Sequence, residues 1–141
     1  MDKIMISVIA LDIYGTVLAT DDPDNELPAR KGIESFFNEC NRRKIRVAST
    51  SDAPNCTLKV HLEDYGLFRF LDSSFQLNQL PHKNFEVVLR YYRIQASELL
   101  VIGDSDKDIN GAISIGARHL RVPEYISFSN DFDFGQIFKI I

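Results

Sequence analysis

The sequence predicts an α/β fold, a Rossmann-like doubly wound parallel sheet, and three observations support this prediction. Apolar runs that are typical of buried strands alternate along the chain with amphipathic segments that are typical of helices. The segments between successive strands are long enough to hold a helix, as right-handed βαβ crossovers require. Polar residues capable of chemistry follow directly after strand candidates, where open α/β sheets bind their ligands.

Five strand candidates are indicated, at residues 6–11, 45–48, within 68–75, and at 99–102 and 119–122. The third is the weakest. The last one stops at Pro123, which cannot donate a hydrogen bond to a neighbouring strand.

Helix candidates lie between these strands and in the tail, at residues 28–44, 54–66, 84–92, 108–116 and within 128–141. Pro28 suits the first turn of the first helix, since a proline lacks only an N–H that has no partner there. Ile33, Phe36, Phe37 and Cys40 are spaced to bury one face of that helix. The aromatic residues of the tail, Phe128, Phe132, Phe134 and Phe138, favour packing against the core.

Length and composition predict one domain over residues 1–141 and exclude several classes of protein. A chain of 141 residues buries one core and leaves little for a second lobe. The net charge of −4 argues against general nucleic-acid binding. No apolar stretch has the length of a membrane span, and the N-terminus does not read as a signal peptide, so we expect a cytoplasmic protein without membrane association. Cys40 and Cys56 suggest reduced thiols, and no histidine or cysteine pair has the spacing of a zinc site.

Four groups fall where strands end or helices begin: Asp12, residues 49–52, Lys83, and Asp104 with Asp108. The carboxyl ends of parallel strands share one edge of a sheet, so we expect these groups to converge. Carboxylates are hard oxygen ligands that suit Mg²⁺, and a lysine neutralises a phosphate oxygen. The sequence therefore predicts a Mg²⁺ and phosphoryl-transfer site.

From Ile6 to about Val122 the chain resembles the haloacid dehalogenase superfamily of hydrolases. Four motifs appear in that family's order, at residues 12–16, 44–52, 83 and 103–112. The resemblance implies the family's fold, a Mg²⁺ cofactor and a nucleophilic Asp12. It also implies metal ligation by Asp12, the Tyr14 backbone carbonyl, Asp104 and Asp108, and phosphate contact by Lys83. Ser51 fits the phosphate-contacting hydroxyl best, with Thr50 as the alternative.

One position departs from the pattern of the family's phosphatases. They usually carry a second aspartate two residues after the nucleophile, as general acid and base, and this chain has Tyr14 there. A tyrosine at this position is similar to the dehalogenase branch of the family. However, the segments 16–51 and 52–83 are too short for the helical cap that encloses haloacid substrates. Asp106, Asp21 and Asp22 are candidate replacements for the missing acid, and we expect Asp52 to cap the helix that follows it.

The leading hypothesis is a small, capless, Mg²⁺-dependent phosphatase-like hydrolase that acts through an aspartyl-phosphate on Asp12. Its substrate would be a phosphorylated small molecule or macromolecule, a phosphoric monoester or an acyl phosphate. Loss of a general acid and base lowers a rate by ~10²–10⁴-fold, so weak activity is expected. The alternative is a catalytically impaired protein that binds a phosphorylated ligand or a protein partner. A dehalogenase and a receiver domain rank below these. An open site is compatible with a homo-oligomer.

Overall fold

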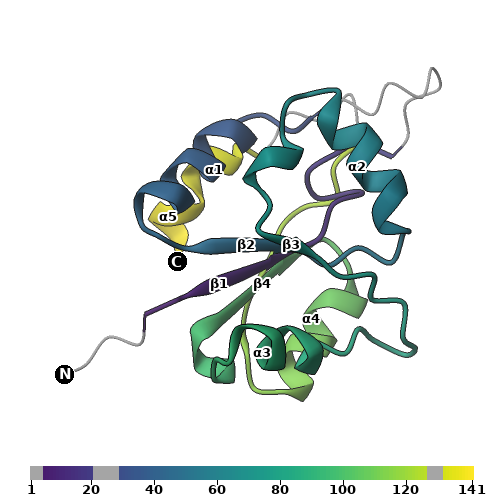
Figure 1. Ribbon diagram of the computed structural model, residues 1–141, viewed down its shortest axis with the longest axis vertical. Helices are drawn as coiled ribbons and strands as arrows, with labels where there is room; N and C mark the ends of the chain where they lie inside the picture. Colours follow the sequence, from purple (N-terminus) through teal and green to yellow (C-terminus); the bar gives the residue numbers. More distant parts are fainter. Residues whose placement is uncertain (1–4, 21–28, 127–131) are drawn as a thin grey trace.

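The computed structural model describes residues 5–20, 29–126 and 132–141. Within these ranges five strands form one parallel sheet in the order β3-β2-β1-β4-β5 (Figure 1). The strands are β1 (Val8–Leu11), β2 (Arg46–Ser49), β3 (Ser73–Ser74), β4 (Leu99–Gly103) and β5 (Arg118–Arg121). The chain builds outward from β1 to β3 and then crosses back to place β4 on the other side of β1. The strand order therefore reverses between β1 and β4, the place where such sheets bind ligands.

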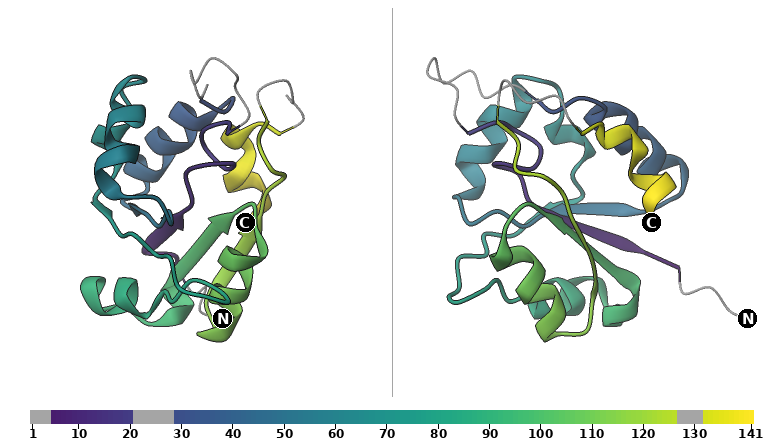
Figure 2. Two further views of the ribbon diagram at one scale, coloured as in Figure 1. Left: turned by 90° about the vertical axis from the view of Figure 1, so that its right-hand side faces the viewer. Right: turned by 180° about the vertical axis from the view of Figure 1, so that it is seen from behind.

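Helices cover both faces of the sheet, as Figures 1 and 2 show. One face carries α1 (Ile33–Arg42), α2 (Asn55–Glu63) and α5 (Ile137–Ile140), and the other carries α3 (Glu86–Tyr92) and α4 (Asp106–Ser114). Alternate residues of β1 divide between the two cores. Ile9 and Leu11 pack with α1 and α2, while Val8 and Ala10 pack with α3 and α4. Burial on both faces explains why β1 is an unbroken apolar run. The doubly wound fold predicted from the sequence is confirmed.

Several predicted boundaries were wrong by a few residues. The first helix begins at Ile33, directly after Gly32 with its positive φ of 80°, and Pro28 lies outside the described residues. The fourth helix begins at Asp106 instead of Asp108, so Asp108 lies in its first turn. The weak third strand predicted within residues 68–75 is confirmed as the two residues of β3, because a short 3-10 turn, η1 (Phe68–Phe70), takes up the start of that segment.

The described part of the tail returns to the core through a 3-10 turn, η3 (Phe134–Gln136), and α5. The Phe134 ring is fully buried, and its centroid lies 5.0 Å from that of Phe36 on α1. The predicted core packing of the tail is confirmed for Phe134, whereas Phe128 lies outside the described residues. No helix in the described part of the chain is long and apolar enough to cross a membrane.

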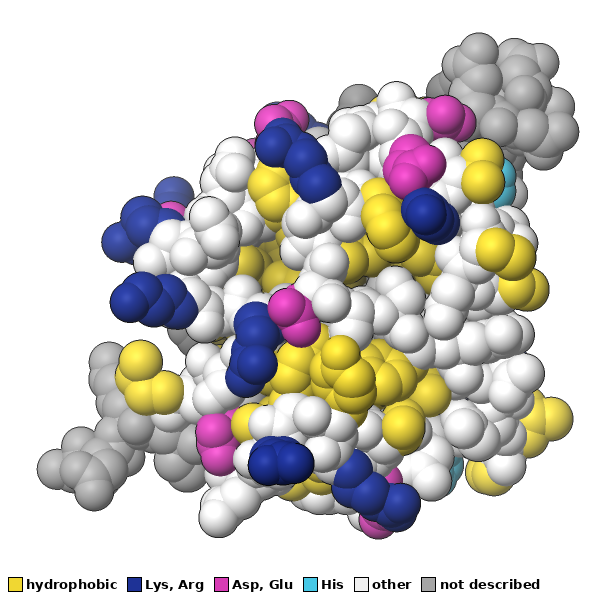
Figure 3. All heavy atoms as spheres, viewed as in Figure 1, with side chains coloured by type: hydrophobic (Ala, Val, Ile, Leu, Met, Phe, Trp, Pro, Cys, Tyr) yellow, Lys and Arg dark blue, Asp and Glu magenta, His cyan; other side chains and the backbone are white. Residues whose placement is uncertain are grey.

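Hydrophobic side chains also gather on the surface over β3 and α3, on the face that Figure 3 shows. On α3, Val87 and Tyr91 are exposed one helical turn apart. The Tyr91 ring meets two neighbouring aromatic rings edge to face, those of Phe75 and Tyr92.

Candidate active site

Asp12 is the first residue beyond β1, at the carboxyl edge of the sheet. Its backbone N–H donates to the Ile102 carbonyl of β4, 3.0 Å away, so the neighbouring strand fixes its position. On the other side of β1, the Thr50 N–H donates to the Leu11 carbonyl, also over 3.0 Å. These two bonds place Asp12 between the ends of β2 and β4, and its side chain is buried.

A tight turn directs the chain back across this edge after Asp12. Gly15 adopts a φ of +84°, which side chains rarely allow, and a Cβ there would lie 2.7 Å from a carboxylate oxygen of Asp104. The close approach brings the Thr16 hydroxyl between two carboxylates. Its Oγ1 is 3.2 Å from Asp12 Oδ2 and 2.8 Å from Asp104 Oδ1. The turn therefore couples the strand ends of β1 and β4, a role of Thr16 that the sequence motif did not reveal.

Lys83 reaches the same place from the loop before α3. Its Nζ donates to Asp12 Oδ1 over 3.1 Å and to Asp108 Oδ1 over 2.6 Å. Burial lowers the pKa of Lys83, but the charges of Asp12 and Asp108 outweigh it, so the pKa lies above the ordinary value for lysine. Gly111 permits this approach, since a Cβ on that residue of α4 would lie 2.3 Å from the Lys83 carbonyl.

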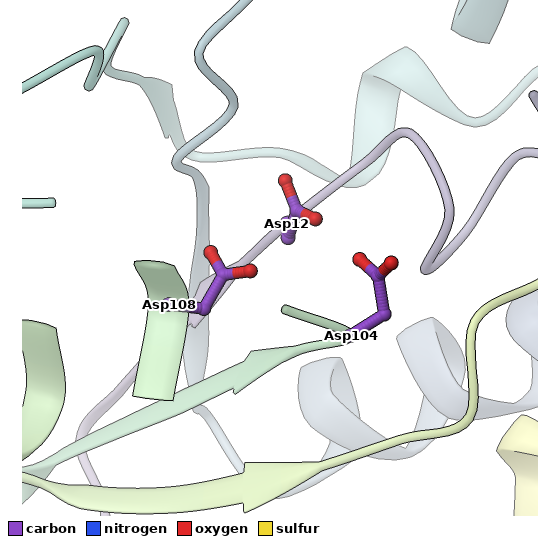
Figure 4. Close-up of side chains that lie close together, drawn as sticks. All are labelled: Asp12, Asp104 and Asp108. Atoms are coloured by element: carbon purple, nitrogen blue, oxygen red, sulfur yellow. The ribbon is translucent and has the colours of Figure 1, made fainter. Parts of the chain in front are cut away.

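Asp12, Asp104 and Asp108 form a compact acidic cluster, whose side chains lie close together in Figure 4. One oxygen from each residue lies within 4.8 Å of the others. Burial raises the pKa of Asp12 well above its usual range, with Lys83 opposing the shift and the two neighbouring carboxylates adding to it. Asp12 and Asp108 are buried and Asp104 is partly buried, and carboxylates brought together in this way are unfavourable unless cations balance them. Lys83 supplies one positive charge, and the oxygen donors fit a divalent cation such as Mg²⁺.

The two hydroxyls that the sequence left as alternatives have different surroundings. Both Thr50 and Ser51 are fully buried. The Ser51 hydroxyl accepts a hydrogen bond from the Ala53 backbone N–H over 3.1 Å and so stabilises the turn after β2. The Thr50 hydroxyl has no hydrogen-bond partner among the described residues, a property it shares with Ser49. Only Thr50 combines an unused hydroxyl with a position directly beside Asp12.

Tyr14 lies two residues after Asp12, in the segment that follows β1. Its hydroxyl lies 2.6 Å from Nδ1 of His61 on α2, and the two rings meet edge to face. Burial raises the pKa of Tyr14 above its usual value. The contact joins the loop after β1 to α2, and nothing in the spacing of Tyr14 and His61 along the chain predicts it.

A cavity of about 400 Å³ opens in front of the acidic cluster, lined by Asp12, Tyr14, Asp52, Lys83, Asp104, Ser105, Asp106 and Lys107. The predicted cap role of Asp52 was wrong: Pro54 precedes α2, no side chain caps it, and Asp52 lines the cavity instead. Asp106 also lines the cavity, but its carboxylate pairs with Arg121. Asp21 and Asp22 lie outside the described residues. A larger cavity of about 520 Å³, bordered by α1, β2 and η1, contains none of the predicted site residues.

Comparisons with known proteins agree with this geometry. Residues 8–122 match the family described as haloacid dehalogenase-like hydrolase. No curated protein matches the sequence. Among solved structures, the chain is similar to a predicted phosphoglycolate phosphatase from Haemophilus somnus 129PT, with a TM-score of 0.77 and 13% identity over 96% of this chain and 97% of the other.

Two further structures show the same fold. CbbY from Rhodobacter sphaeroides, in complex with xylulose-(1,5)bisphosphate, gives a TM-score of 0.73 with 14% identity over 92% of each chain. The L-2-haloacid dehalogenase from Xanthobacter autotrophicus gives 0.70 with 14% identity over 84% of this chain and 78% of the other. The family match covers most of the chain and includes every strand of the sheet. The chain therefore belongs to the haloacid dehalogenase-like hydrolase family.

Proposed function

We propose that this protein is a Mg²⁺-dependent phosphatase-like hydrolase that transfers a phosphoryl group to Asp12. The contact of Lys83 with both Asp12 and Asp108, beside Asp104, carries this proposal. The site combines a buried carboxylate, a lysine that contacts this carboxylate and two further carboxylates nearby. These are the components that an aspartyl-phosphate mechanism needs. The phosphatase and sugar-bisphosphate complex among the similar folds lend support.

Each residue has a task in this mechanism. Asp12 attacks the phosphorus atom, the bond to the leaving oxygen breaks, and the phosphoryl group stays on the Asp12 carboxylate. The Lys83 ammonium favours the ionised form of Asp12 and neutralises a phosphate oxygen. We assign the phosphate-contacting hydroxyl to Thr50, because Thr50 lies directly beside Asp12 and its buried hydroxyl has no hydrogen-bond partner among the described residues. The Ser51 hydroxyl accepts from the Ala53 N–H but keeps its own O–H to donate, so it is the alternative.

Asp12, Asp104 and Asp108, with the Tyr14 backbone carbonyl, would hold Mg²⁺. When bound, the ion supplies positive charge that stabilises the transferring phosphoryl group. The substrate is a phosphorylated small molecule or macromolecule, since nothing in the described residues narrows the class further. Self-association into a homo-oligomer remains a proposal, for which the exposed Val87 and Tyr91 of α3 offer a surface.

The test is phosphate release from acetyl phosphate and p-nitrophenyl phosphate with and without Mg²⁺. We expect wild-type protein to release phosphate only with Mg²⁺, and Asp12→Asn to release none, because an amide cannot accept the phosphoryl group. Asp64→Asn is a matched control, since Asp64 is an exposed residue after α2 that does not line the cavity. Turnover that persists in Asp12→Asn would contradict the proposal.

The second candidate is a protein that binds a phosphorylated ligand without hydrolysing it. The contact between the Tyr14 hydroxyl and His61 favours it, since Tyr14 stands where phosphatases carry an acid and base. Tight binding of beryllofluoride with Mg²⁺, combined with no turnover of a broad panel of phosphate esters, would support this candidate over the first.

A further inference from the structure

We propose that Asp52 is the general base that activates water to hydrolyse the phosphoryl group on Asp12. This inference rests on the proposed function and adds to it the residue that replaces the missing second aspartate. It is carried by the position of Asp52 on the wall of the same cavity as Asp12 and by its unengaged carboxylate.

The other side chains that line the cavity are committed elsewhere. Asp12, Asp104 and Lys83 belong to the acidic cluster and its hydrogen bonds. The Tyr14 hydroxyl contacts His61, the Ser105 hydroxyl donates to Asp108, and the Asp106 carboxylate pairs with Arg121. Lys107 carries no carboxylate. Among the described residues, Asp52 is the carboxylate of this cavity that has neither an ion-pair nor a hydrogen-bond partner.

The backbone around Asp52 is held in place, although its side chain is exposed. The Ser51 hydroxyl accepts from the Ala53 N–H over 3.1 Å, and the Ser51 carbonyl accepts from the Leu77 N–H over 2.9 Å. The Asp52 carbonyl itself accepts from Nε2 of Gln76 over 3.2 Å. A general base has to be held at a set distance from its water, and these three bonds fix the Cα from which the carboxylate extends.

The cavity has room for the hydrolysis of phospho-Asp12. Its volume of about 400 Å³ exceeds many times the roughly 30 Å³ that one water occupies, so a phosphoryl group and an attacking water fit together. The water oxygen bonds to phosphorus as its proton passes to the Asp52 carboxylate. The bond between phosphorus and the Asp12 oxygen breaks, and its electron pair returns to Asp12. Inorganic phosphate leaves, and Asp52 then loses the proton to solvent.

The experiment follows the phosphorylated enzyme directly. Wild type, Asp52→Asn, Asp106→Asn and the exposed control Asp64→Asn are mixed with acetyl phosphate and Mg²⁺. The reactions are quenched with acid and analysed by intact mass and peptide mapping. We expect Asp52→Asn to phosphorylate Asp12 at the wild-type rate but to hydrolyse the product ~10²–10⁴-fold more slowly, the usual effect of losing a general base. The phosphorylated form then accumulates only in Asp52→Asn.

The outcomes separate the inference from the function on which it rests. If wild type forms phospho-Asp12 and Asp52→Asn hydrolyses it at the wild-type rate, the role of Asp52 is overturned and the phosphatase proposal stands. Slowing in Asp106→Asn instead of Asp52→Asn would also overturn it, and would assign the base to Asp106. If no variant forms phospho-Asp12 and none releases phosphate, both proposals are wrong.

Discussion

Two clusters of ion pairs in this protein have the same arrangement of charges, but one is buried and the other lies on the surface. In the buried cluster, Lys83 lies 3.1 Å from Asp12 and 2.6 Å from Asp108, and the lysine side chain is 4% exposed. In the surface cluster on α1, Glu39 pairs with Arg42 and with Arg43, the latter at 2.8 Å, and the Arg42 side chain is 69% exposed. Both clusters place one charge between two opposite ones.

The difference between them is the effect of water. Hydrogen bonds from Arg42 and Arg43 lower the pKa of Glu39 to about 2, yet solvent screens these charges and the pairs contribute little to folding. In the buried cluster, burial raises the pKa of Asp12 despite the neighbouring lysine, which means that the fold holds the carboxylate where its charge is unfavourable. Such an arrangement adds little to stability and is typical of functional sites.

The largest expected effect is that of Lys83→Met, which removes the cation and leaves two carboxylates buried together. Breaking a buried ion pair from one side costs about 3–5 kcal/mol of unfolding free energy. Urea unfolding at neutral pH measures this loss. Arg42→Met on the surface is the control and should change the unfolding free energy far less. Equal effects in the two variants would mean that the two clusters do not differ as described.

An intermediate effect is expected from Mg²⁺, which would supply the buried cluster with the positive charge it lacks. A ligand at 100 times its Kd stabilises a folded protein by about 2.7 kcal/mol. Differential scanning fluorimetry with increasing MgCl₂ measures the shift, and Asp104→Asn should reduce it. A melting temperature that does not respond to Mg²⁺ in wild type would argue against the metal site.

The stabilisation by Mg²⁺ should increase as the pH rises. Because the folded-state pKa of Asp12 is raised above its ordinary 3.8, the metal-free protein gains stability from Asp12 at acid pH and loses it as the pH rises through the raised value. Mg²⁺ binds the ionised carboxylate, so its stabilisation should grow over the same pH range. Constant stabilisation across this range would contradict the raised pKa.

The smallest effect is expected for Glu39→Gln in the surface cluster. Because the pKa of Glu39 is lowered, its charge would stabilise the folded state at pH values above the ordinary pKa of 4.5. This stabilisation would be lost as the pH falls toward about 2. Since Glu39 and its partners face solvent, we expect melting temperatures of the variant and wild type to agree within error at pH 7. A clear drop that disappears in 1 M NaCl would show that this cluster contributes more than surface pairs usually do.

Much of the acidic cluster could be predicted from the chain alone. Asp12 and Asp104 directly follow strands, and Lys83 and Asp108 lie before α3 and in the first turn of α4. Parallel strands bring such positions together whatever the details of packing. The sequence motif favoured Ser51 over Thr50. It could not show that the Ser51 hydroxyl accepts from the Ala53 N–H whereas the Thr50 hydroxyl has no partner among the described residues, because these contacts exist only in the folded chain. It also assigned Asp52 to a helix cap, since an aspartate before a helix is typical of one.

The contacts of Tyr14 with His61 and of Thr16 with Asp104 were beyond prediction for a similar reason. These pairs are separated by 47 and 88 positions, and no periodicity connects them. They depend on the packing of α2 and of the turn at Gly15 against the sheet edge.

The sequence by itself determined the doubly wound sheet, the edge at which the charged residues meet and the family, because strand and helix periodicity, strand-end positions and motif order are local properties of the chain. The tertiary structure alone decided which hydroxyl stays unused, which aspartate faces the cavity and which carboxyl has its pKa raised. Those properties depend on burial and on distances between residues far apart in the chain, which exist only once the fold has formed.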